Sequence, residues 1–125
     1  MTMQPTKLNV LIVDDSLLAA QVMTNALHDL GHNVVKVAKS GSEAVVAYKN
    51  HNPDVVTMDV TMPDMDGIAA TQKIVKEFPD ARVIMVTSHT QHSTVVDALK
   101  AGAKGYIVKP FHTDKLRDVL AQAVG

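Results

Sequence analysis

The 125-residue sequence contains no cysteine and no tryptophan, and only 3% of its residues are aromatic. Without cysteine the chain can form no disulfide, no thiolate nucleophile and no thiolate metal site. It also lacks a long hydrophobic run, since the first mostly apolar stretch, Leu8–Val13, has only six residues. A membrane-spanning helix needs about 20 apolar residues, and the residues before this stretch are polar. We therefore expect neither membrane insertion nor a signal peptide.

An excess of either charge is missing as well. Twelve Lys and Arg residues oppose thirteen Asp and Glu residues, which gives a formal net charge of −1. No basic field attracts nucleic acid or anionic lipid, so we expect no direct nucleic-acid partner. The length and the hydrophobic share of 46% suit one domain with its own core. These properties predict a single domain over residues 1–125 with a cytoplasmic location.

The acidic residues are unusual in kind and in position. Eleven of the thirteen are Asp and only two are Glu, although Glu is the better helix former. Asp favours turns, helix caps and ion sites. Five of the eleven lie in two short stretches: Asp14 and Asp15 in the first, and Asp59, Asp64 and Asp66 in the second. The negative charge is thus concentrated rather than spread over the surface.

Short apolar runs recur along the chain at nearly regular spacing. They are rich in Val and Ile and too short for buried helices, which favours β-strands. The predicted strands are Leu8–Val13, Val34–Ala38, Val55–Met58, Val83–Val86 and Tyr106–Val108. Four of them are almost continuously apolar, as is typical of parallel strands covered on both faces. Val34–Ala38 is interrupted by Lys36 and is predicted to be an edge strand.

The stretches between these runs have helical periodicity. Apolar residues between residues 18 and 30, Leu18 and Val22 among them, recur at a spacing of four, and residues 116–123 show a similar pattern. Ser40–Glu43 has the pattern of a capping box, and Gly31 and Gly102 stand where helices commonly end. Strands that alternate with helices predict an α/β fold, (βα)₅, with five parallel strands and helices on both faces of the sheet.

Polar residues follow four of the predicted strands directly. Such sheets bind ligands beyond the carboxyl ends of their strands. Asp14 and Asp15 follow the first strand, Asp59 the third, Thr87 the fourth and Lys109 the fifth. We therefore expect three carboxylates, one hydroxyl and one amine to converge on one rim of the sheet.

This group of side chains suits phosphoryl chemistry. Three carboxylates in one crevice repel one another unless a cation offsets them, and oxygen ligands favour Mg²⁺. Lysine and threonine can contact a phosphoryl oxygen, and a carboxylate can itself become an aspartyl-phosphate. Asp59 is the best candidate for the acceptor, because it stands alone at the end of a central strand, and Asp14 and Asp15 are then the metal ligands.

Each feature alone has an ordinary structural explanation. Asp14 and Asp15 could serve only the start of a helix, and Asp59 could be a turn residue. Thr87 could be a cap, and Lys109 followed by Pro110 indicates only that a strand has ended. Coincidence at four strand ends is much harder to accept than coincidence at one.

The sequence resembles the receiver domain of two-component response regulators over nearly its whole length. The matching elements are Val13-Asp14-Asp15-Ser16, Met58-Asp59-Val60-Thr61-Met62-Pro63-Asp64-Met65-Asp66-Gly67, Val86-Thr87-Ser88 and Ala101-Gly102-Ala103-Lys104-Gly105-Tyr106-Ile107-Val108-Lys109-Pro110-Phe111. The resemblance implies a flavodoxin-like fold with strand order 2-1-3-4-5. It is closest to the chemotaxis type, in which the receiver stands alone.

The resemblance also implies roles for individual residues. Asp59 would accept a phosphoryl group from the phosphohistidine of a histidine kinase. Mg²⁺ would be held by Asp59, by Asp15 directly, by Asp14 through water and by the carbonyl of Thr61. Lys109 would contact the phosphoryl group and precede a cis peptide bond to Pro110. The protein would be a signalling phosphoacceptor that catalyses only its own phosphorylation and dephosphorylation, not an enzyme in the usual sense.

A two-state switch is implied in the same way. Thr87 would move toward the phosphoryl oxygen while Tyr106 turns inward. An output protein would then bind the face formed by the fourth helix, the fifth strand and the fifth helix. Ser88 stands where the family usually has Ala, and His89 lies near the path of the hydrolytic water, so both bear on the phosphoryl lifetime.

Several alternatives stay open at this point. The sequence ends at Gly125, just after the fifth helix, so a stand-alone receiver is expected. A receiver excised from a larger regulator, with a DNA-binding or enzymatic output domain, is the main alternative. A flavodoxin-like flavin protein or a phosphatase that uses an aspartyl-phosphate fits the loop sequences less well. Four of the histidines outside these motifs are expected to be solvated, namely His28, His32, His51 and His112.

Overall fold

The structure is a computed structural model that describes the whole chain except residues 1–6, 61, 63–64 and 89–91. Its strands are β1 (Asn9–Val13), β2 (Asn33–Ala38), β3 (Val55–Asp59), β4 (Val83–Thr87) and β5 (Gly105–Val108). Its helices are α1 (Leu17–Asp29), α2 (Gly41–His51), α3 (Gly67–Glu77), α4 (His92–Lys100) and α5 (Thr113–Val124). Within the described residues, no helix is both long and apolar enough to cross a membrane.

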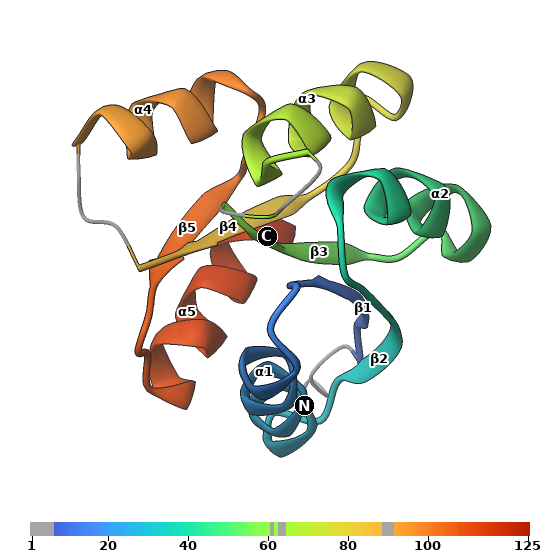
Figure 1. Cartoon of the computed structure of the whole chain (residues 1–125). Coiled ribbons are helices and arrows are strands. Elements are labelled where there is room, and N and C mark those ends of the chain that lie inside the picture. Colours follow the sequence, from blue (N-terminus) through green and yellow to red (C-terminus); the bar gives the residue numbers. More distant parts are fainter. Residues whose placement is uncertain (1–6, 61, 63–64, 89–91) are drawn as a thin grey trace.

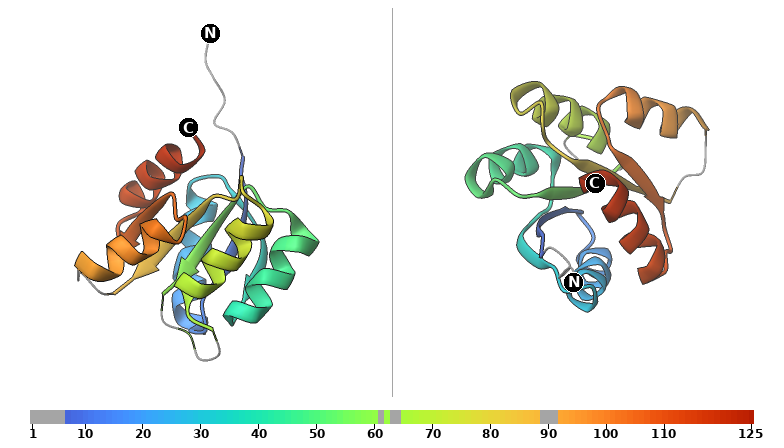
Figure 2. Two further views of the ribbon diagram at one scale, coloured as in Figure 1. Left: turned by 90° about the horizontal axis from the view of Figure 1, so that it is seen from above. Right: turned by 180° about the vertical axis from the view of Figure 1, so that it is seen from behind.

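The five strands form one parallel sheet in the order β2-β1-β3-β4-β5. Helices α1 and α5 cover one face of the sheet, and α2, α3 and α4 cover the other (Figure 1). The view from above in Figure 2 shows the layer of α2, α3 and α4 in front of the strands. This is the predicted (βα)₅ arrangement, and the strand order implied by the resemblance is confirmed.

Two separate hydrophobic cores lie on opposite faces of the sheet. Successive side chains of a strand point to opposite faces, so Val56 and Met58 of β3 join the core beneath α2, α3 and α4. Val55 of the same strand joins the other core, together with Ile12 and Ile84. Both faces are therefore packed, which explains why the central strands are nearly continuously apolar.

The two edge strands differ from the central ones. Val34–Ala38 lies in β2 at one edge, as predicted from Lys36. The expectation that the other four strands are covered on both faces is wrong for β5, because β5 forms the opposite edge and its Tyr106 is 41% exposed. An apolar run of three residues gives no indication of which neighbouring strand is missing. Five strand boundaries also differ by one residue from the predicted ones. Asp59 and Thr87 belong to β3 and β4, and β1, β2 and β5 begin at Asn9, Asn33 and Gly105.

The predicted helix ends are present. Ser40 caps α2 by accepting a hydrogen bond from the Glu43 N–H at 3.1 Å. Gly31 and Gly102 both have positive φ, at 87° and 110°, which a residue without a side chain adopts most readily.

Two sequence expectations about individual side chains need correction. Leu18 and Val22 on the apolar side of α1 are 77% and 51% exposed, because the apolar stripe is wider than the surface that α1 buries. His28, His51 and His112 are exposed as expected. His32 is not fully solvated, since its Nδ1 accepts a hydrogen bond from the Leu8 N–H at 3.1 Å.

Candidate functional site

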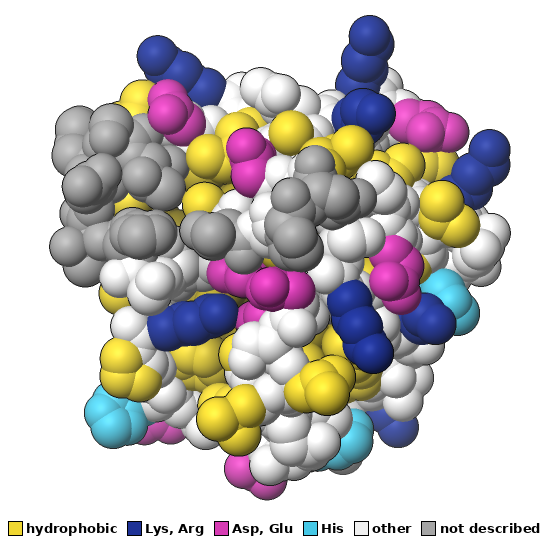
Figure 3. Space-filling model, viewed as in Figure 1, with side chains coloured by type: hydrophobic (Ala, Val, Ile, Leu, Met, Phe, Trp, Pro, Cys, Tyr) yellow, Lys and Arg dark blue, Asp and Glu magenta, His cyan; other side chains and the backbone are white. Residues whose placement is uncertain are grey.

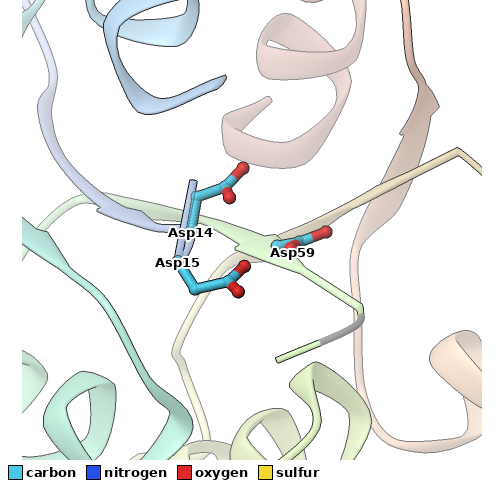
Figure 4. A group of neighbouring side chains, drawn as sticks. All are labelled: Asp14, Asp15 and Asp59. Atoms are coloured by element: carbon cyan, nitrogen blue, oxygen red, sulfur yellow. The ribbon is translucent and has the colours of Figure 1, made fainter. Parts of the chain in front are cut away.

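The polar residues at the strand ends lie together, as the sequence predicts. Strands β1 and β3 are neighbours, so Asp14, directly after β1, lies beside Asp59 at the end of β3 (Figure 4). The Asp14 N–H donates to the Ala38 carbonyl at 3.0 Å, which extends the β-sheet pairing by one residue. The Lys109 N–H donates to the Thr87 carbonyl at 2.8 Å in the same way. Continued backbone pairing therefore fixes the backbone positions of Asp14 and Lys109.

Three carboxylates form the centre of the site. One oxygen from each of Asp14, Asp15 and Asp59 lies within 4.8 Å of the others. Asp14 and Asp59 are buried and Asp15 is exposed. Figure 3 shows acidic side chains gathered at the centre of this face of the molecule. We refer to these three residues as the acid cluster.

Lys109 neutralises part of the acid cluster. Its Nζ lies 3.0 Å from Asp14 Oδ2 and 3.5 Å from Asp59 Oδ1. The other oxygen of Asp14 accepts a hydrogen bond from the Ser16 N–H at 2.9 Å. Asp14 is therefore held on two sides, whereas Asp15 extends from the same turn toward solvent.

The shifted pKa values reflect this crowding. Burial raises the pKa of Asp59 above its ordinary value, the Lys109 ammonium opposes the rise, and the Asp14 and Asp15 carboxylates add to it. Burial alone would lower the pKa of Lys109, but its hydrogen bond to Asp14 and the charge of Asp59 outweigh burial and raise it. The charged form of Lys109 is thus favoured in the site, whereas the charged form of Asp59 is disfavoured.

Gly67, at the start of α3, fixes the backbone at Asp59. Its N–H donates to the Val60 carbonyl at 2.8 Å, and the Val60 N–H donates to the Val86 carbonyl at 3.2 Å. A Cβ at position 67 would collide with the carbonyl oxygen of Asp59. Glycine is therefore required for this close approach. Gly67 lies in a motif that the resemblance rests on, but this role was not predicted, and the Asp-Gly pair at the start of α3 is its sequence signal.

The remaining predicted site residues have different surroundings. Thr87 is buried at the end of β4, while Ser88 and Pro110 are exposed beside it and beside Lys109. The Lys109–Pro110 peptide bond is cis, as the resemblance implies. Tyr106 lies in the outer strand, away from the acid cluster. Two predicted residues, Thr61 and His89, lie outside the described residues.

The residues present fit a hard divalent cation. The three carboxylates carry more negative charge than Lys109 balances, and they offer only oxygen donors. Mg²⁺ takes one or two carboxylates and keeps several waters, so an open cluster with an exposed member such as Asp15 suits it. A bound cation would offset the repulsion within the cluster and hold an oxygen of an incoming phosphate.

Comparisons with known proteins agree with this geometry. A family described as the response regulator receiver domain matches residues 10–121. Chemotaxis protein CheY of Bacillus subtilis is 45% identical over 111 residues, which cover 89% of this chain and 92% of that protein.

Two solved structures are also similar over most of their length. The first is the CheX-CheY-BeF₃-Mg²⁺ complex from Borrelia burgdorferi, with a TM-score of 0.86, 43% identity and coverage of 90% of this chain and 85% of that chain. The second is the response regulator domain of Thermotoga maritima CheB, with a TM-score of 0.87, 35% identity and coverage of 95% and 97%.

Proposed function

Because the chain belongs to the response regulator receiver domain family, we propose that Asp59 is the residue that accepts the phosphoryl group. The acid cluster with Lys109 carries this proposal, since Asp59 is the member at the end of the central strand. Its carboxylate is reachable from the open edge of the cluster, where Asp15 is exposed. The receiver family consists of phosphoacceptors in two-component systems, and membership of this family makes the protein a phosphoacceptor response regulator.

In the proposed step, an Asp59 oxygen attacks the phosphorus of a phosphohistidine. A P–O bond forms, the P–N bond breaks, and the electron pair of that bond leaves with the imidazole. Lys109 balances charge on the phosphoryl oxygens, because its ammonium already lies 3.5 Å from Asp59 Oδ1. The protein is therefore a signalling phosphoacceptor rather than a classical enzyme, and the only reactions we propose for it are those at its own Asp59.

Intact mass spectrometry with acetyl phosphate and Mg²⁺ tests the acceptor. The wild-type mass should rise by one phosphoryl group, and Asp59→Asn should abolish the rise. Asp54→Asn is the matched control, because Asp54 lies before the other end of the same strand and binds the Asn9 N–H. Labelling that persists in Asp59→Asn, or that is lost equally in Asp54→Asn, would contradict the assignment.

Mg²⁺ is the proposed cofactor, with Asp15 and Asp59 as direct ligands and Asp14 holding it through water. The carbonyl of Thr61 is proposed as a further ligand from the resemblance alone. Chelation with EDTA should abolish labelling by acetyl phosphate, because the carboxylates then repel the incoming phosphate. Asp15→Asn should raise the Mg²⁺ concentration needed for labelling without removing the acceptor. Full labelling in EDTA would rule out the metal.

The proposed partners are a histidine kinase and an output protein that binds α4, β5 and α5. Leu99 and Tyr106 are 49% and 41% exposed on this face, so a partner would find apolar surface there. In the proposed switch, Thr87 closes on the phosphoryl group and Tyr106 turns inward. Thr87→Ala should still accept phosphate but lose most of the gain in partner affinity. If Thr87→Ala kept the full gain in partner affinity, the coupling between Thr87 and Tyr106 would be refuted, but the assignment of Asp59 as the acceptor would stand.

Chemotaxis is the proposed pathway, because the relative from Bacillus subtilis is a chemotaxis protein matched over 92% of its length. The proposed location is the cytoplasm, on the strength of the family. A receiver that belongs to a larger regulator remains the second candidate, since the Thermotoga relative is itself one domain of CheB. The length of the reading frame distinguishes the two. Ser88 and His89 are proposed to set the phosphoryl lifetime, so His89→Ala should change the decay rate but not the labelling.

A further inference from the structure

A groove separates α1 from the connection between β5 and α5, on the face of the sheet opposite α2, α3 and α4. Its volume is about 470 Å³, within the roughly 300–1,000 Å³ range of small-molecule sites. Its walls are mostly apolar and include Leu18, Val22 and Met23 of α1 and Phe111 of the connection. Figure 3 shows hydrophobic side chains in this region, below the acidic centre. The groove is therefore apolar and of ligand size, and it shares Pro110 and Phe111 with the neighbouring α4-β5-α5 face.

One polar group lies at the bottom of this groove without a hydrogen-bond partner among the described residues. Thr57 of β3 lines the groove and is 1% exposed, and its Oγ1 is the buried side-chain oxygen that lacks a partner. The Thr57 side chain lies on the α1 and α5 side of the sheet, because Thr57 pairs with Ile12 and Ile84 of the core on that side. A buried hydroxyl without a partner costs free energy, and a ligand that supplied a hydrogen bond to it from the groove would recover that cost.

We propose that this groove binds a neutral small molecule with an apolar body and one hydrogen-bonding oxygen, such as a phenol or an alcohol. The apolar body would lie along α1, and its oxygen would reach Thr57. Met23 also lines the groove, and its unbranched side chain can change conformation to admit the ligand.

The charges at the end of the groove argue for a neutral ligand. Asp14 and Lys109 also line this end, but each is already bound to the other at 3.0 Å. An anionic ligand would face the carboxylates of the acid cluster, and a cationic one would compete with Lys109 for Asp14. Only a neutral oxygen gains a new hydrogen bond without disturbing that ion pair.

Two probes of nearly equal shape, phenol and toluene, test the proposal by titration of the methyl NMR signals of Leu18, Val22 and Met23. Both should give saturable shifts at these methyl groups in the wild-type protein. Thr57→Val replaces the hydroxyl by a methyl group of similar size. It should weaken phenol binding about fivefold, the value of one ordinary hydrogen bond, and leave toluene binding within about twofold.

Thr71→Val provides the matched control. Thr71 is equally buried on the other face, but its hydroxyl donates to the Gly67 carbonyl at 2.7 Å. Its loss should lower the urea midpoint, whereas Thr57→Val should leave the midpoint unchanged or raise it. Phenol affinity should be unchanged in Thr71→Val.

Three outcomes would overturn the proposal. The first is the absence of saturable shifts at the α1 methyl groups for both probes. The second is equal phenol affinity in the wild type and Thr57→Val. The third is an equal loss of stability in Thr57→Val and Thr71→Val, which would mean that the Thr57 hydroxyl already has a partner. Ala19→Leu, which adds bulk to a lining position, should weaken both probes together if the groove is the site.

Discussion

Neutralising the acceptor carboxylate should make the metal-free protein more stable. Asp59 lies within 4.8 Å of both Asp14 and Asp15, so each pair repels by about 3.5 kcal/mol at an effective dielectric constant of about 20. Lys109 at 3.5 Å from Asp59 attracts it by about 5 kcal/mol on the same scale. The repulsions exceed the attraction by about 2 kcal/mol, and screening at the exposed Asp15 reduces this excess. Asp59→Asn should therefore raise the free energy of unfolding by about 1–2 kcal/mol.

Urea denaturation in EDTA at pH 7 measures this difference. The midpoint should rise by roughly 0.5–1 M, given ordinary urea dependence for a domain of this size. Asp80→Asn is the control, because it removes one negative charge from an exposed turn far from the acid cluster. Its midpoint should move by no more than a surface substitution usually causes.

The pH dependence of the gain gives a stricter test. The pKa of Asp59 is raised in the folded protein, so its protonated form is favoured by folding. The contribution of Asp59 to the stability of the wild type is most favourable below its unfolded pKa of 3.8 and is lost as the pH rises through its folded pKa. The advantage of Asp59→Asn should therefore vanish at low pH and grow toward neutrality. An advantage that is absent at pH 7, or equal at pH 3 and pH 7, would refute the electrostatic reasoning.

Three further predictions follow from the site and its surroundings. Mg²⁺ at ten times its dissociation constant should stabilise the wild type by about 1.4 kcal/mol, and Asp15→Asn should shift that response to higher Mg²⁺ concentration in the same urea titration. Burial lowers the pKa of His32, so its contribution to the free energy of unfolding should be complete above pH 6.5 and be lost as the pH falls. His32→Asn keeps an acceptor for the Leu8 N–H and should make the free energy of unfolding less dependent on pH. Equal pH dependence in the wild type and the variant would contradict this. Gly67→Ala should cost about 1–3 kcal/mol through overpacking against the Asp59 carbonyl, measured by thermal unfolding, and an unchanged melting temperature would contradict the close approach.

Much of the fold could be predicted because each strand and helix has a local signal. Apolar runs rich in Val and Ile predict the strands, and the capping box at Ser40–Glu43 predicts the start of α2. That Asp14 and Asp59 lie at the same edge of the sheet follows from parallel strands alone, whereas the order that makes β1 and β3 neighbours came from the resemblance to a known family. The exposure of Tyr106 does not follow from the residues of β5 themselves, because the edge position of β5 depends on the strand order, which came from the resemblance.

The features that sequence reasoning missed depend on contacts between distant segments. His32 accepts a hydrogen bond from Leu8, 24 residues earlier, and no spacing rule connects the two. In the sequence, Thr57 is an ordinary β-branched strand residue. Its burial beneath the groove depends on α1 and on the connection between β5 and α5, which are distant in sequence. Leu18 fits the apolar period of α1 and yet is exposed, because periodicity does not report how wide a stripe the sheet can cover.

The packing of Gly67 against the Asp59 carbonyl determines how a mutational scan of this protein should look. A scan scored by signalling alone would rank both positions as intolerant, as though each took part in phosphoryl transfer. Cellular abundance would separate them. Variants at Asp59 should reach normal cellular abundance and fail to signal. Variants with a side chain at position 67 should be less abundant, because the side chain displaces the strand end that carries the acceptor. Gly67 would then be recognised as a position that gives the acceptor its place while having no chemistry of its own.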